Sequence, residues 1–240
     1  MEAARHFPTT SWTLILSAGR QTDARNGDAL ASLCEKYWYP LYAYIRRRGY
    51  PREQAQDLTQ EFFARVLEKH YIEHADRNKG RFRTFLLSSL TYFLSDEVDR
   101  RQALKRGGSH VLLPFEVREG EETYQREPSH NETPERIFER RWALALLERV
   151  LARLRNEFVT GGEPAHFERL KVFLLGDGAG VPYAELAGEL QTTEGALKVA
   201  IHRLRKRYSD GLRAEIAETV ADPAEIDGEI RYLVRVLAAK

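Results

Sequence analysis

Apolar residues recur at intervals of three and four along most of the chain, the spacing that places them on one face of an α-helix. In the N-terminal half this pattern predicts a short helix over Ser11–Ala18 and longer helices over 28–49, 51–69 and 82–105. Pro40 interrupts the second of these stripes, which predicts a kink or a break there. No segment alternates apolar and polar residues as a half-buried strand does. We therefore predict an all-α fold.

A polar segment separates two sets of predicted helices. Gly107 and Gly108 end the third long helix, and the residues from there to Pro134 contain three prolines and lack helical periodicity, as linkers do. Helicity resumes at Pro134, with Thr133 as the N-cap, and breaks at Gly161 and Gly162. Shorter helices follow over 167–175, 182–190 and 193–212, and a last amphipathic segment carries Ile226, Ile230, Leu233, Val234 and Leu237.

The strongest local pattern lies in residues 182–205. A short helix, a polar turn at Gln191 and Thr192, and a second helix capped by Thr192 or Thr193 are typical of a helix-turn-helix. The predicted inward residues are Leu186, Ala187, Leu190, Leu197, Ile201 and Leu204, and the small Ala187 and Ala196 would let the two helices cross closely. The candidate DNA-binding residues of the second helix are Thr193, Glu194, Lys198, Val199, His202, Arg203 and Arg205. In such folds the early residues of the second helix contact base edges and later cations contact phosphates. An ordinary helical hairpin with a basic solvent face gives the same pattern.

The composition restricts the possible functions less than the motifs do. The net charge is only +1, but basic residues cluster at 46–48, 100–106 and 203–207, and an acidic stretch over 116–127 lies between the last two clusters. Separated charge of this kind suggests basic docking faces, although solvated helix faces would look the same. One cysteine, Cys34, excludes an internal disulfide, and the chain has no apolar run long enough to span a membrane. We expect a cytoplasmic protein.

Sequence signatures of enzymes are missing. The chain has no phosphate-binding loop, no GxSxG elbow and no HExxH motif. His70 and His74 have the spacing of a metal pair but lack an evident third ligand, so a solvated helix end explains them better. We expect neither catalysis, nor a cofactor, nor a metal site.

Three blocks in order resemble the extracytoplasmic-function (ECF) class of bacterial sigma factors. They are residues 54–68 (QAQDLTQEFFARVLE), residues 80–101 (GRFRTFLLSSLTYFLSDEVDRR) and the helix-turn-helix. The resemblance implies sigma domain two over 1–106, a linker over 107–134 and sigma domain four over 135–213, with no domain three. Residues 214–240 form a C-terminal extension outside the family pattern.

The resemblance also implies partners and site residues. Domain two would dock on the clamp helices of the RNA polymerase core through Asp57, Gln60, Glu61 and Phe63. It would open the minus-ten element of promoter DNA with Arg81, Phe82, Arg83, Tyr92, Arg100, Arg101 and Lys105. Aromatic rings that stack on unpaired bases, interleaved with cations, suit that task. Phe82 and Tyr92 are the candidates for exposed rings, although simple packing also fits them. Many family members carry asparagine at the position of Tyr92.

The remaining implied contacts involve the linker and domain four. Domain four would bind the polymerase flap and read the minus-thirty-five element. In the family the linker threads the polymerase's active-site and RNA-exit channel, and an acidic strap suits a channel built for RNA. A flexible spacer is the alternative. An anti-sigma factor or a Ser/Thr kinase would regulate the protein.

The docking helix departs from the family pattern at its start. Gln54 and Gln56 stand where an acidic motif of the Asp-Ala-Glu-Asp type usually has acids. Some ECF groups that lack these acids carry a threonine just downstream and are thought to be switched on by kinases. Thr59 occupies such a place, and phosphorylation would restore about −1.5 to −2 charges. An inert helix residue is the alternative, since Glu61 already supplies negative charge.

Two other classes of protein compete with the sigma-factor hypothesis. A helix-turn-helix regulator that acts without the polymerase core would carry a ligand pocket or a dimer face in its N-terminal half. A structural adaptor made of helical hairpins would bind no DNA at all.

Overall fold

The computed structural model describes residues 24–66, 81–103, 124, 132–174, 180–220 and 222–239. These residues form α-helices and short 3-10 turns, and no strand occurs among them. The predicted all-α class is thereby confirmed. The helix expected at Ser11–Ala18 and nearly all of the expected linker lie outside the described residues.

The chain divides into two compact units, and each is described by itself. One comprises residues 1–144 together with 217–240, and the other comprises residues 145–216. The sequence-based boundaries differ from this division, because residues 214–240 were expected as a separate extension. The structure instead groups almost all of that segment with the N-terminal unit.

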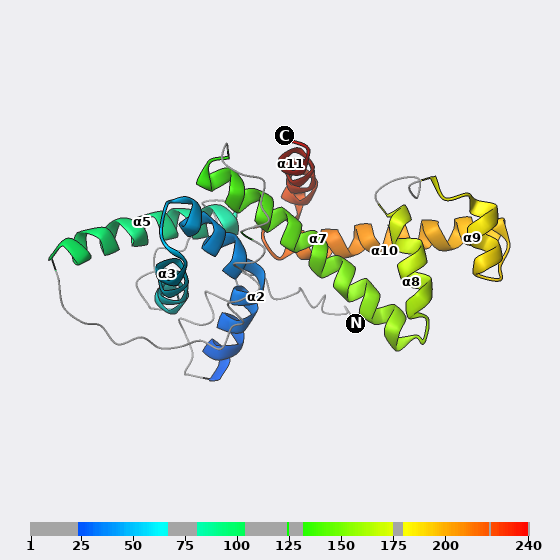
Figure 1. Cartoon of the computed structure of the whole chain (residues 1–240), viewed down its shortest axis with the longest axis horizontal. Helices are drawn as coiled ribbons and strands as arrows, with labels where there is room; N and C mark the ends of the chain where they lie inside the picture. The colour runs from blue at the N-terminus through cyan, green and yellow to red at the C-terminus, as the bar shows by residue number, and fades with distance from the viewer. Residues whose placement is uncertain are drawn as a thin grey trace, which may run out of the picture. The chain divides into compact units, whose positions relative to one another are not determined.

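The N-terminal unit is built from long helices (Figure 1). They are α2 (Ala24–Arg47), α3 (Arg52–Val66), α5 (Phe82–Ala103), the first part of α7 (Pro134–Thr160), the turn η4 (Pro223–Glu225) and α11 (Ile226–Ala238). Gly49 lies just after α2 with φ +92°, a left-handed conformation that favours glycine and ends the helix. α3 packs against both α2 and α5.

Helix α2 continues through Pro40, so the predicted break is wrong. Proline removes its own N–H from the helical ladder, which weakens a helix but does not by itself end one. The rings of Trp38 and Tyr42 stack with centroids 5.0 Å apart, on either side of Pro40 in the sequence. Pro40 and both flanking rings are buried. Packing therefore supports the helix where its hydrogen bonding is weakest.

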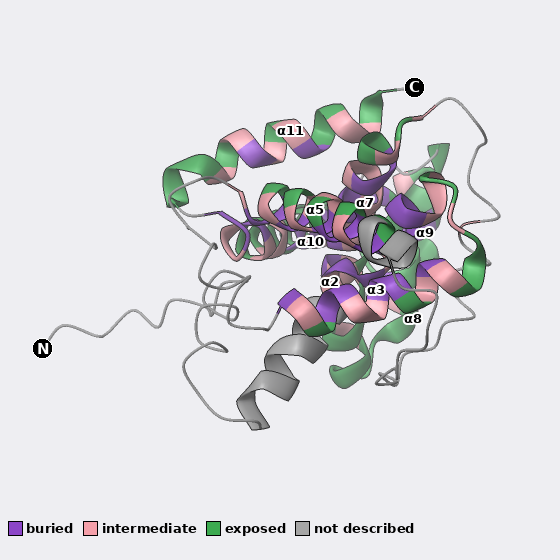
Figure 2. Ribbon diagram, turned by 90° about the vertical axis from the view of Figure 1, so that its left-hand side faces the viewer, coloured by how far each residue is buried: buried purple, intermediate pink, exposed green. Residues whose placement is uncertain are grey.

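Aromatic side chains dominate the core of the N-terminal unit. Figure 2 shows the buried residues gathered on the inward faces of its helices. The fully buried rings are Tyr37, Tyr42, Tyr44, Phe62, Phe63, Phe82, Phe93, Phe138 and Trp142. The ring of Phe62 lies 5.7 Å from that of Phe93, and the ring of Tyr37 lies 5.3 Å from that of Phe82. Each such ring contributes about 1.5–3 kcal/mol through burial, so these contacts fasten α2, α3 and α5 together.

The second unit contains the shorter helices. They are the rest of α7, α8 (Pro164–Leu170), η2 (Lys171–Phe173), α9 (Tyr183–Glu189) and α10 (Glu194–Ala217) as far as Ile216. The predicted break at Gly161 and Gly162 is confirmed, and Gly162 has φ +77°. α8 begins earlier than the expected residue 167, because Pro164 is well suited to the first position of a helix.

The core of the second unit joins all its helices. It consists of Val150, Leu154, Phe167, Leu170, Phe173, Leu186, Ala187, Leu197, Ile201, Leu204 and Tyr208. α7 and α10 approach closely at Gly211, where an added Cβ would lie 3.0 Å from Cγ1 of Val150. This core holds α9 and the first half of α10 on a fixed base.

Candidate nucleic-acid interface

The turn between α9 and α10 has a defined backbone geometry. Gln191 adopts φ +50°, a left-handed conformation unusual for a residue other than glycine. Its N–H donates to the carbonyl of Gly188 at 3.2 Å, and the N–H of Thr192 donates to the carbonyl of Ala187 at 2.9 Å. This pair of bonds is a Schellman motif, which satisfies the last carbonyls of α9 and reverses the chain.

Thr193 is the N-cap of α10. Its hydroxyl oxygen accepts a hydrogen bond from the N–H of Ala196 at 3.2 Å, which decides between the two threonines that the sequence offered. Five of the six residues predicted to face inward are buried, and Leu190 is half-buried. Ala196 is exposed, so it does not set the approach of the helices. The helix-turn-helix pattern itself is present in the structure.

The outward face of α10 carries cationic and hydrogen-bonding groups at helical spacing. Its exposed residues include Thr193, Glu194, Lys198, Val199, His202 and Arg203. The Nζ of Lys198 lies 5.6 Å from the ring centre of Tyr183, which itself packs 5.4 Å from Phe173 in the core. The ring thereby restricts the lysine on the exposed face. A lysine held in this way loses less side-chain entropy when it binds a phosphate.

Arg205 has an intramolecular role that the sequence did not indicate. Its Nε donates to the carbonyl of Phe173 at 2.8 Å, which holds η2 against α10. Arg207, one turn from Arg203, forms an ion pair with Glu157 and lies over the ring of Phe158. The guanidinium groups of Arg205 and Arg207 are thus committed to the fold, whereas Lys198 and Arg203 present their charges outward.

The predicted polymerase-docking residues fall into two groups. Asp57 is exposed, and Gln60 and Glu61 are half-buried on α3. The ring of Phe63 is fully buried, so the expected surface contact by Phe63 is not found. It supports α3 from inside, because α3 is packed on two sides and its apolar stripe is wider than the sequence suggested.

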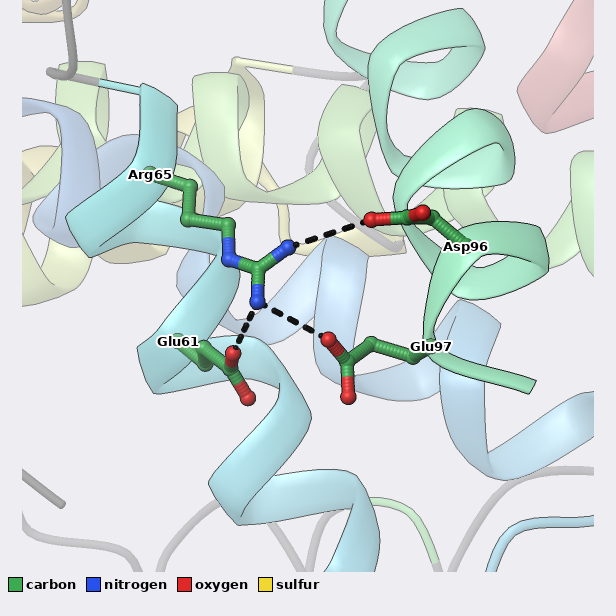
Figure 3. A network of polar contacts seen from close by, with 4 residues as sticks. All are labelled: Glu61, Arg65, Asp96 and Glu97. Atoms are coloured by element: carbon green, nitrogen blue, oxygen red, sulfur yellow. Dashed lines mark hydrogen bonds and ion pairs between the residues drawn. The ribbon is translucent and has the colours of Figure 1, made fainter. Parts of the chain in front are cut away.

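An ion network joins α3 to α5 beside these residues (Figure 3). Arg65 contacts the carboxylates of Glu61 at 2.6 Å, Glu97 at 2.9 Å and Asp96 at 3.5 Å. The guanidinium carbon also lies 5.0 Å from the ring centre of Phe93. One cation faces three anions, so the surface of this network is acidic. Arg65 was not among the residues predicted from the sequence, although its spacing of four from Glu61 was the available signal.

Thr59 does not present its hydroxyl to solvent. The side chain is fully buried, and Oγ1 donates to the carbonyl of Ala55 at 2.6 Å. A kinase requires an accessible hydroxyl, which this conformation withholds. The hypothesis of a phosphorylation switch at Thr59 therefore loses its structural basis, and the inert helix residue is the better interpretation.

The predicted DNA-melting residues of α5 are placed in contrasting environments. Tyr92 is 70% exposed, as expected for a ring that stacks on bases, whereas Phe82 is fully buried and the expectation of an exposed ring is wrong. Phe82 is the first residue of α5, and the partners that cover it are distant in the sequence. Arg83 is also buried and Arg81 is half-buried. Arg100 and Arg101 belong to α5, but their side chains lie outside the described residues, as does all of Lys105.

Comparisons of the chain with protein-family models, with curated proteins and with solved structures found no match. In the part of the chain that the structure describes, no three His, Cys, Asp or Glu side chains come together as a metal site. None of the described helices combines the length and apolarity that crossing a membrane requires. The candidate interface therefore has to be judged on its own geometry.

Proposed function

We propose that this protein is a transcription-initiation factor of the ECF sigma class, which binds the RNA polymerase core and directs it to promoter DNA. The observation that carries the proposal is the helix-turn-helix of α9 and α10. Its turn is closed by the Schellman motif at Gln191, its second helix is capped by Thr193, and Lys198 and Arg203 lie on the outward face of that helix.

The outward face of α10 suits the major groove of a promoter. A recognition helix contacts base edges with its first turns, where Thr193, Glu194 and Lys198 are exposed. Arg203, ten residues after Thr193, would hold a phosphate. Few phosphate contacts give weak binding by one module alone, so stable promoter binding requires a second module on the same assembly.

The N-terminal unit supplies features that fit this second module. Asp57 and the network of Glu61, Asp96 and Glu97 form an acidic surface where α3 meets α5. Such a surface complements a basic docking site on a large partner. On α5, the exposed ring of Tyr92 is available to stack on an unpaired base.

A mobility-shift assay with polymerase core and promoter DNA tests the proposal. In the holoenzyme, the combined Lys198→Ala and Arg203→Ala variant should lose about tenfold or more in promoter affinity, because each base or phosphate contact contributes about 1–3 kcal/mol. The combined Arg153→Ala and Arg155→Ala variant is the matched control, since it also removes two exposed cations of the same unit, which pair with Glu157 and Glu168.

Binding of the variants to the polymerase core is the second measurement. The α10 variants should bind core as the unmodified chain does, because docking is assigned to α3. Promoter affinity that is unchanged in the double variant, or core binding lost in it, would contradict the proposal.

A further inference from the structure

The C-terminal helix α11 holds a fully buried carboxylate against two arginines at the start of α5. Glu229 has no exposed surface. Its Oε2 lies 2.8 Å from Nε of Arg81, and its Oε1 forms an ion pair with Nη1 of Arg83. One anion of α11 thus pairs with two cations that flank Phe82, and Glu139 of α7 also lies near Arg83.

An aromatic ring of α11 covers the same two cations. The guanidinium of Arg83 lies between two rings, 4.3 Å from the centre of Tyr232 and 4.6 Å from that of Trp142 on α7. Arg81 lies 5.5 Å from the centre of the Tyr232 ring. Glu229 and Tyr232 are three residues apart, so both project from one face of α11.

The groups that α11 presents are an anion and a flat ring, which are the two recognisable parts of a nucleotide. The surface beneath consists of two guanidinium groups, and the indole of Trp142 supports that of Arg83 from behind. Such a surface can hold a phosphate and stack on a base. We propose that this surface, made of Arg81, Arg83 and Trp142, binds single-stranded nucleic acid, and that α11 covers it by mimicking that ligand. The inference rests on the proposed function, since it assigns a covered strand-binding site to the unit that opens the promoter.

The energetics of α11 suit a cover that can be displaced. Only Glu229 and Leu233 are buried among its residues, and its outer face is exposed (Figure 2). The attraction in a buried ion pair is largely offset by the cost of removing both partners from water. Helices with little apolar burial are among the first elements to open. A polyanion that supplies its own phosphates can therefore compete with Glu229 for the two arginines.

The segment that leads into α11 is fastened separately. The carbonyl of Thr219 accepts a hydrogen bond from the N–H of Phe82 at 3.2 Å, and Glu218 forms an ion pair with Lys36 on α2. Thr219 and Val220 are buried. The residues that make these contacts precede η4 in the chain. α11 can therefore move away from Arg81 and Arg83 while residues 218–220 stay packed on the N-terminal unit.

Single-stranded nucleic acid fits this surface better than an acidic peptide does. A peptide carboxylate would satisfy the two arginines but would leave the face of Arg83 that Tyr232 covers without a stacking partner. A duplex offers phosphates with its bases already stacked inside. Unpaired bases beside a phosphate supply both groups at once.

The test compares Glu229→Gln with Glu225→Gln in the full chain. Glu225 is exposed in η4. Its replacement by glutamine removes the same charge as Glu229→Gln without changing a contact with the arginines. The probe is a fluorescent single-stranded DNA of about 12 nucleotides, titrated at several salt concentrations. Glu229→Gln should bind it at least about fivefold more tightly, with a salt slope steeper by about 1.4 because two further cations meet phosphates. Glu225→Gln should match the unmodified chain.

Three outcomes would overturn the inference. The first is equal affinity of Glu229→Gln and Glu225→Gln for the single-stranded DNA. The second is an equal gain in the affinity of Glu229→Gln for a polyglutamate peptide. The third is a gain in DNA affinity that persists when Arg81→Gln is added to the Glu229→Gln chain. If Glu229→Gln loses helix content, hydrogen exchange of the unmodified chain decides instead: saturating oligonucleotide should lower the protection of α11, and unchanged protection would overturn the proposal.

The tighter binding of single-stranded DNA by Glu229→Gln should persist when Lys198 and Arg203 are replaced by alanine. A loss of promoter recognition in those variants concerns the proposed function alone, so the two ideas can fail separately.

Discussion

The guanidinium of Arg65 lies 2.9 Å from Oε1 of Glu97, and this ion pair joins α3 to α5. Both side chains are mostly buried, with 15% and 12% of their surfaces exposed. The same guanidinium also holds Glu61 and Asp96, so α5 is fixed to the helix assigned to polymerase docking. A single cation thus links the two helices, beside the packing of Phe62 against Phe93.

Replacement of Arg65 by methionine should destabilise the N-terminal unit by about 2 kcal/mol, because three carboxylates would face one another without a cation. Glu97→Gln is the matched control and should cost less, since Arg65 keeps two anionic partners. Urea denaturation followed by circular dichroism measures both variants. Equal stability of the Arg65→Met variant and the unmodified chain would show that the network contributes nothing.

Arg203 and Arg205 are neighbours on α10 with opposite predicted effects. Arg205→Ala should lower the free energy of unfolding by about 1–1.5 kcal/mol, because the carbonyl of Phe173 loses its hydrogen-bond donor at a partly exposed site. Arg203→Ala should change stability by less than about 0.5 kcal/mol, as exposed substitutions do, while reducing promoter affinity. Denaturation and mobility-shift assays on both variants give the comparison. The assignment fails if the two variants behave alike.

Gln191 occupies a left-handed position that glycine adopts without steric cost. Gln191→Gly should therefore stabilise the second unit by about 1 kcal/mol. Gln191→Ala keeps the strained conformation and should leave stability nearly unchanged. Thermal unfolding of the three chains distinguishes them, and a lower melting temperature for Gln191→Gly would show that the turn is not strained.

The pKa of Tyr232 is raised above its usual value of 10.0, mainly by burial and further by Glu139. The neutral phenol is therefore favoured in the folded chain. Its contribution to stability is complete below about pH 10 and is lost as the pH rises through the folded-state pKa. Tyr232→Phe should reduce the fall of stability above pH 10.

Tyr208 is the internal reference for this effect, because burial raises its pKa as well. Tyr208→Phe should reduce the alkaline fall through the second unit, whereas Tyr232→Phe should act through the first. Urea denaturation over a pH series, with ring ionisation followed by ultraviolet absorbance, measures both. An alkaline profile that neither substitution alters would contradict these assignments.

The sequence predicted the helices and the inner face of the helix-turn-helix because both depend on neighbours close in the chain. Leu197, Ile201 and Leu204 follow a spacing that α10 alone imposes, and all three are buried. Phe63 and Phe82 were misplaced because their burial depends on elements that come from elsewhere in the chain. Hydrophobic periodicity marks a face as apolar but does not indicate which of its rings meet solvent.

Glu229 shows a second limit of sequence reasoning. The apolar stripe of α11 was visible at Leu233, but a carboxylate on the buried side of a helix has no periodic signature. Its burial is explained only by Arg81 and Arg83, which lie far away in the sequence. Long-range ion pairs of this kind cannot be found without the fold.

Run-off transcription with purified bacterial polymerase core and a genomic fragment library shows whether this protein directs the start of transcription. We expect discrete transcripts that require this protein and that disappear when Lys198 and Arg203 are both replaced by alanine, with core binding unchanged. Core that starts no transcript in the presence of the protein, or a protein that never associates with core, would contradict it.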